Sequence, residues 1–208
     1  MNPIILALIA TDLFVFAGLG LTAPIFAIFI ERNVVGGSIA AAGIAQTIYM
    51  VVKAILQMFV GRFNDRDRVY LREYWTALIG YAIIAVIPFL YIAVESIAQL
   101  YVVQALFGIG AAFAYPGFMT IFTKFADRQR EGLEWSSYST AVFLGMAVSA
   151  AVGAWSVEQF GFDRTFIAVG ILAAIGCIAF ASLGLRYAEL RRDHHPPVRH
   201  PRDVLPVK

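Results

Sequence analysis

Long apolar runs separated by short polar segments make up most of this 208-residue chain. Six runs stand out, at residues 3–30, 39–60, 75–94, 97–123, 135–157 and 165–185. Each is close to the ~20 residues that a helix needs to cross the hydrocarbon core of a membrane. Lipid cannot form hydrogen bonds with backbone N–H and C=O groups, so only helices and closed barrels span a membrane. The runs do not alternate apolar and polar residues as the strands of a membrane barrel do. They therefore predict an all-α membrane protein with six transmembrane helices.

The polar segments predict how the chain is threaded. Segments 61–74, 124–134 and 186–208 contain 4, 3 and 6 Lys or Arg residues, whereas the intervening segments contain only Arg32 and Arg164. Basic loops remain on the cytoplasmic side of a membrane. We therefore expect an integral protein of the cell inner membrane with both termini in the cytoplasm. Residues 1–186 form the predicted transmembrane domain, and the basic, Pro-rich residues 187–208 form a cytoplasmic tail that we expect to be disordered.

Composition narrows the classes of function. The chain is 60% hydrophobic and 14% charged, and its net charge of +2 suits contact with membrane lipid rather than with nucleic acid. The three His residues all lie in or beside the tail, at positions 194, 195 and 200, and Cys177 is the one cysteine. The runs hold no Ser–His pair or metal-ligand cluster, and the sequence has no phosphate-binding Gly-rich loop. It therefore predicts no enzyme activity, no cofactor and no metal site.

The helices fall into two groups of three. Gly18 and Gly20 precede Pro24 in the first run, and Gly108 and Gly110 precede Pro116 in the fourth. In the predicted topology these two helices run in opposite directions. Matching interruptions of this kind are typical of inverted repeats, so we expect two inverted three-helix repeats. The fifth run also has one face of small residues that lets another helix approach closely, at Ala141, Gly145, Ser149 and Gly153.

The six runs contain two charged residues, Asp12 and Lys53. Counted from the cytoplasmic ends of their helices, both lie at similar depth, close to the middle of the membrane. A charge there costs at least ~2.5–3.5 kcal/mol, so each needs a partner or water. We predict that the two interact, either as a buried pair that fixes packing or as part of a substrate or ion site.

Further polar residues mark a candidate pathway. Gln46, Tyr49, Lys53 and Gln57 are spaced by 3, 4 and 4 residues, so they form one stripe along the second helix. The stripe is either a hydrogen-bonded seam between helices or the lining of a substrate pathway. Gln104 and Tyr115 in the fourth run are weaker candidates for the same pathway.

The run Gly61-Arg62-Phe63-Asn64-Asp65-Arg66, between the second and third helices, resembles the signature loop of the major facilitator superfamily. Gly108-x-Gly110 in the fourth run and Gly161-Phe162-Asp163-Arg164 before the sixth are similar to that family as well. The resemblance covers about residues 5–186 and implies the amino-terminal six-helix half of a major facilitator fold. It also implies secondary active transport of a small molecule by alternating access.

The sequence departs from the family pattern at identifiable places. Gln104 stands where the family often has an Arg tied to proton coupling, and Gly153 is followed by Ala154 where antiporters have Pro. With these two features of proton-coupled members missing, the proton is only one candidate for the coupling ion. The family usually has twelve helices in two halves, so we expect this chain to work with a second six-helix chain, as a homodimer.

The resemblance also gives the signature loop a role. One interpretation is that Asp65 and Arg66 are charged loop residues in water. The other, implied by the resemblance, is that Gly61, Asp65 and Arg66 belong to a conformational latch, in which the loop contacts the start of a helix in the other half. Under the second interpretation Asp65 faces residues 135–138 of the partner chain. The alternatives to a two-chain transporter are a non-transporting scaffold or receptor of the same fold, and an amino-terminal fragment of a twelve-helix transporter.

Overall fold

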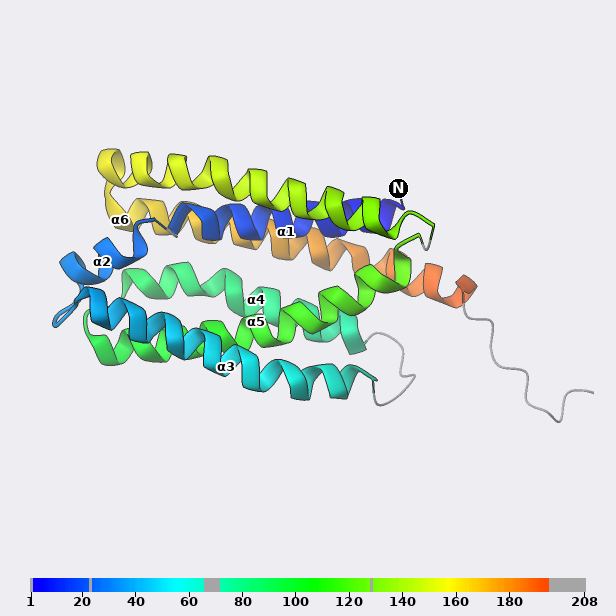
Figure 1. The fold of residues 1–208 in the computed structure, drawn as a ribbon, viewed down its shortest axis with the longest axis horizontal. Coiled ribbons are helices and arrows are strands. Elements are labelled where there is room, and N and C mark those ends of the chain that lie inside the picture. The colour runs from blue at the N-terminus through cyan, green and yellow to red at the C-terminus, as the bar shows by residue number, and fades with distance from the viewer. Residues whose placement is uncertain (1, 23, 66–71, 128, 195–208) are drawn as a thin grey trace, which may run out of the picture.

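The computed structural model describes residues 2–22, 24–65, 72–127 and 129–194, the last ten of these as backbone alone. The described residues form helices joined by short connections, together with one isolated bridge between Val35 and Ser96. The helices are α1 (Pro3–Thr22), α2 (Phe26–Asn33), α3 (Ile39–Asp65), α4 (Arg72–Ile92), α5 (Ile97–Phe125) and α6 (Glu131–His194). They lie roughly parallel or antiparallel in one bundle (Figure 1). Five of them, all except α2, are long and apolar enough to cross a membrane.

The first predicted run is two helices rather than one. α1 ends at Thr22, and α2 begins at Phe26 and continues beyond the predicted end of the run, to Asn33. Pro24 lies in the break, where its missing N–H and its ring disfavour a continuous helix. With 20 residues, α1 already spans ~30 Å at 1.5 Å per residue, so the break comes where the first crossing is complete. Pro88 and Pro116, by contrast, lie inside unbroken helices.

The fifth and sixth predicted runs are the two arms of α6. The polar loop expected at 158–164 is reduced to one non-helical residue, Gly161, with φ 81° and ψ 174°. Figure 1 shows an outgoing arm, residues 131–160, and a returning arm, residues 162–194, that comes back alongside α1. Glycine adopts this positive φ without a Cβ clash, which allows so tight a reversal. With the two arms counted separately, the bundle has six spans.

Close approach of α1 and α6 positions the rest of the bundle. The small-residue face predicted in the outgoing arm packs against α1, and a Cβ placed on Gly153 would collide with the backbone of Leu21. α4 packs mainly on α5 and α6, and α3 packs mainly on α5. The buried core includes Leu8, Tyr81, Phe118 and Phe180, which come from all of these elements except α3.

The ends of the helices are held by specific polar contacts. Ser96 and Gln99 form a reciprocal capping box at the start of α5. Glu73, 2% exposed near the start of α4, forms a 2.8 Å salt bridge with Lys124 near the end of α5. This pair fixes the ends of two neighbouring helices on the side where the sequence predicts cytoplasm.

Helix α3 is the least covered span. Only 17% of the residues in its most apolar stretch are buried, compared with 39–56% in the other spans. The helix carries exposed apolar side chains, including Met50, Met58 and Phe59, together with the polar stripe predicted from the sequence. The arrangement of the six spans as two inverted repeats stays a prediction. Residues 187–194 of the predicted tail continue α6 as helix, whereas residues 195–208 lie outside the described part of the chain, so disorder there stays a prediction.

Candidate functional site

Asp12 is buried where three helices meet. Its side chain is 3% exposed, on α1. One carboxylate oxygen accepts a short hydrogen bond from Tyr81 of α4, and the other accepts a 2.8 Å hydrogen bond from Tyr138 of α6. Hydrogen bonds to a charged group contribute about 1.5–3 kcal/mol each. Two of them offset part of the cost of holding the carboxylate at this depth.

Lys53 has aromatic partners instead of an acidic one. Its ammonium lies 5.0 Å from the ring centre of Tyr115 on α5 and 5.9 Å from that of Tyr49 on its own helix. Such cation–π contacts contribute from about 0.5–1 kcal/mol at exposed sites to about 2 where the cation is desolvated. Lys53 is half-buried.

The predicted ion pair between Asp12 and Lys53 is wrong for this structure. Both residues are described, and the salt bridges among the described residues do not include one between them. They instead line one small cavity of about 60 Å³, together with Tyr81 and Tyr115. The shared cavity agrees with the matched depths, but Asp12 makes its hydrogen bonds to Tyr81 and Tyr138, and Lys53 lies over the rings of Tyr115 and Tyr49.

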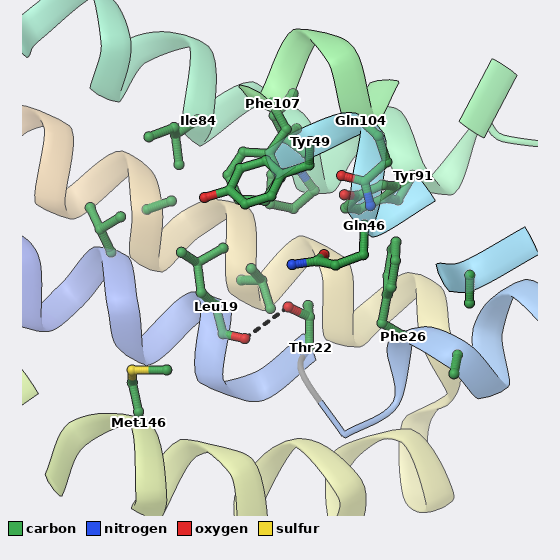
Figure 2. A pocket seen from close by; sticks show the side chains of 17 residues that line it. Leu19, Thr22, Phe26, Gln46, Tyr49, Ile84, Tyr91, Gln104, Phe107 and Met146 are labelled. Atoms are coloured by element: carbon green, nitrogen blue, oxygen red, sulfur yellow. Dashed lines mark hydrogen bonds between the residues drawn. The ribbon is translucent and has the colours of Figure 1, made fainter. Parts of the chain in front are cut away.

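A larger cavity adjoins this one. It has a volume of about 430 Å³, and Val15, Leu19, Tyr49, Ile84 and Phe107 line both cavities. Its 17 lining residues come from all six helices, including both arms of α6 (Figure 2). The lining is mostly aliphatic and aromatic, and the amides of Gln46 and Gln104 point into it (Figure 2). A pocket of this size and character is typical of sites for small molecules.

Gln104 is a polar residue of this cavity that is fully buried and whose amide oxygen lacks a partner. Its side chain is 1% exposed, and its amide oxygen has no hydrogen-bond partner among the described residues. A buried acceptor left in this state costs about 1–3 kcal/mol. The oxygen has almost no accessible surface, so a donor in the cavity pairs with it only when the amide turns toward the space.

The other predicted site residues are spread more widely. Tyr115 is 46% exposed and lines the small cavity, whereas Gln57 is half-buried and lines neither cavity. Gly61 and Asp65 lie in the last turns of α3, where Asp65 is exposed. Arg66 lies outside the described residues, so the structure brings together the pathway candidates but not the complete latch.

Sequence reasoning missed Tyr81 and Tyr138, the two residues that hold Asp12. A signal was present, because Asp12 lies nine residues after the start of α1 at Pro3, and Tyr81 lies nine after the start of α4 at Arg72. Tyr138 lies seven residues after Glu131, at nearly the same depth. Comparing the depths of tyrosines as well as of charged residues would have identified these two hydroxyls as candidate partners of Asp12.

The family model described as Major Facilitator Superfamily matches residues 8–206, which is nearly the whole chain. No curated protein matches the chain. Among the described residues no group of three or more His, Cys, Asp or Glu side chains is placed to hold a metal ion.

Proposed function

Because this chain belongs to the major facilitator superfamily, whose members transport small molecules across membranes, we propose that it is one six-helix body of an alternating-access transporter. The observation that carries the proposal is the pair of charged residues at mid-membrane. Asp12 and Lys53 line one cavity between helices without neutralising each other. A protein with a purely structural role gains nothing from such charges, since each is costly at this depth.

The proposed pathway consists of the two adjoining cavities. Gln46, Tyr49 and Gln104 line the larger one, and Asp12, Lys53, Tyr49 and Tyr115 line the smaller one. Gln57 continues the stripe along α3 toward the cytoplasmic end. A proton is the candidate coupling ion and Asp12 its candidate carrier, because the hydroxyls of Tyr81 and Tyr138 rotate easily from donating to accepting a hydrogen bond.

Transport is tested by counterflow. A screen of purified protein for compounds that raise its unfolding temperature supplies candidate substrates. Proteoliposomes preloaded with an unlabelled hit should then accumulate the labelled compound transiently. Asp12→Asn and Lys53→Gln should each slow this exchange at least tenfold. If stabilising compounds are found and none exchanges, the protein binds but does not transport.

The second body is a second copy of this chain, related by a two-fold axis along the membrane normal. The support is α3, which is poorly covered and carries Gln46, Lys53 and Gln57 among its apolar residues. Polar side chains at membrane depth face protein or water rather than lipid. Mass measurement in nanodiscs should give twice 22.8 kDa of protein. A single chain that carries out exchange would contradict the dimer, and a partner of different mass would point to a distinct second half.

The latch closes between Asp65 of one body and the start of α6 in the other. Asp65 is exposed at the end of α3, and Ser137 is half-buried one turn and a half into α6. A carboxylate near a helix start contributes about 0.3–1 kcal/mol, which suits a contact that opens in every cycle. Asp65→Cys and Ser137→Cys, with Cys177→Ala, should give an intermolecular disulfide whose yield changes with substrate. A disulfide within one chain, or none, contradicts this placement.

A further inference from the structure

The larger cavity differs in chemistry from the smaller one that adjoins it. None of the described residues that line it is Asp, Glu, Lys, Arg or His, whereas Asp12 and Lys53 both line the smaller cavity. A charged molecule in the larger cavity would lose its hydration and find no countercharge, which is prohibitive in a low-dielectric site. The occupant of the larger cavity is therefore uncharged.

Four aromatic rings define the shape of the space. Tyr49 and Phe107 lie with their centres 4.5 Å apart, and Phe26 and Tyr91 meet edge to face at 5.5 Å. All four line the cavity, and Leu19 and Ile84 are among the aliphatic residues between them (Figure 2). Rings of this kind pack well against a flat aromatic or alicyclic body.

The volume limits the size of the occupant. A closed apolar cavity of ~150 Å³ holds benzene, with its six carbon atoms. By proportion, the 430 Å³ here has room for up to roughly 17 non-hydrogen atoms. Two or three fused or linked rings match this volume.

Gln104 supplies the most buried specific contact. Its amide oxygen has no partner among the described residues, so it gains a hydrogen bond when the amide turns toward a donor in the cavity. A site built to receive a donor discriminates strongly against an analogue that lacks one, because the buried oxygen is then left unpaired. Gln46, from the opposite helix, offers a second amide to the same molecule.

We propose that the larger cavity is a binding site for an uncharged, compact aromatic or alicyclic molecule with one hydroxyl or N–H group, which donates to Gln104. This proposal rests on the transport function proposed above, and it names the class of substrate that the protein would carry. The ligand binds inside a six-helix body, among residues from all six helices of the chain. The charged residues of the adjoining cavity do not contact it and remain free for coupling.

The test uses three probes of matched shape on the full-length protein in nanodiscs: 4-phenylphenol, 4-methylbiphenyl and biphenyl-4-carboxylate. Equilibrium dialysis against protein-free nanodiscs of the same lipid removes the contribution of partitioning into the membrane. We expect saturable binding of 4-phenylphenol with one site per chain. Binding of 4-methylbiphenyl should be at least tenfold weaker, and the carboxylate should not bind above background.

Two variants separate the donor contact from the volume. Gln104→Leu should bind 4-phenylphenol and 4-methylbiphenyl with affinities within threefold of each other, because the acceptor is gone. Ala27→Trp, at an exposed position that lines the cavity, should weaken both at least tenfold by filling the space. Gln159→Leu is the matched control, because Gln159 is exposed near the end of the outgoing arm and should leave all affinities unchanged.

Equal affinity of the unmodified protein for the phenol and the methyl compound would overturn the proposal. So would tight binding of the carboxylate, or no saturable binding of any probe. These outcomes are independent of transport, since dialysis measures binding alone. Selective binding without counterflow would support the binding site and contradict the transport function. Counterflow of an unrelated compound, without selective binding of these probes, would support the transport function and contradict the binding site.

Discussion

At the scale of single residues, the contacts of Asp12 are the most consequential in the molecule. Tyr81 is 3% exposed and donates to one oxygen of this buried carboxylate, and Tyr138 donates to the other. Removing one hydroxyl leaves a charged acceptor at membrane depth without one of its two donors. The loss is therefore larger than the ordinary value for a neutral hydrogen bond.

Tyr81→Phe should lower the free energy of unfolding by about 1.5–3 kcal/mol, the range for a hydrogen bond to a charged group. Titration with SDS in mixed micelles measures this. Tyr101→Phe is the matched control, because the Tyr101 hydroxyl makes no hydrogen bond among the described residues, and its change should stay within about 0.5 kcal/mol. Equal effects of the two changes would mean that the contact with Asp12 does not form.

Asp12→Asn and Lys53→Gln should show a coupling energy of no more than about 1 kcal/mol in unfolding, since the two residues share a cavity wall but each has its own aromatic partners. The double variant in the same SDS titration provides the measurement. A coupling energy above ~1 kcal/mol would restore the direct ion pair that matched depth alone suggests.

The reason the pairing was mispredicted is geometric. Position along an apolar run predicts the depth of a residue, and Asp12 and Lys53 do line one cavity, as matched depths predict. Depth says nothing about which way a side chain faces around the helix axis, and that orientation depends on packing. The Asp12 side of α1 faces α4 and α6, so Tyr81 and Tyr138 reach it first.

At the scale of helices, the contact between α1 and the outgoing arm of α6 depends on small residues. A Cβ on Gly153 would overlap the Leu21 backbone, which cannot move without displacing α1. Gly43, on α3, has open space where its Cβ would lie. The same substitution at these two positions should therefore have opposite effects.

Gly153→Ala should destabilise the protein by about 1–3 kcal/mol through overpacking. Gly43→Ala should be neutral or stabilise it by up to about 0.5–1 kcal/mol, because alanine favours a helix over glycine. Unfolding of both variants in the same detergent provides the comparison. Destabilisation of similar size at both sites would show that helix propensity, rather than the contact with α1, determines the effect.

The sequence predicted the number of spans and most of their extents, because apolar length is a direct requirement of the membrane. It did not predict that the first run is broken after Thr22 or that the loop at 158–164 is reduced to Gly161. The break depends on the missing N–H of Pro24, and the tight turn depends on the positive φ of Gly161. A count of apolar residues does not detect either backbone feature. The small face of the fifth run was found because spacing alone reveals it, and its packing against α1 is confirmed.

At the scale of the whole molecule, the positive-inside pattern predicts which end of the bundle faces the cytoplasm. Gln129 is exposed next to the start of α6, and Gln159 is exposed at the turn between its arms. With Cys177→Ala as background, Gln159→Cys should react with an impermeant thiol reagent in intact cells. Gln129→Cys should react only after permeabilisation, and the reverse pattern would invert the topology.

The central claim is that the site around Lys53 opens alternately to the two sides of the membrane. Lys53→Cys in the Cys177→Ala background tests it without knowledge of the substrate, in right-side-out and inside-out vesicles treated with an impermeant thiol reagent. A transporter that samples both states should be labelled at measurable rates in both preparations, even if the minor state is only about 0.1–10% populated. Gln129→Cys and Gln159→Cys, each labelled in one preparation only, verify the orientation of the vesicles. Labelling of Lys53→Cys in one orientation alone, or in neither, would contradict transport and leave a membrane protein of this fold with a static role.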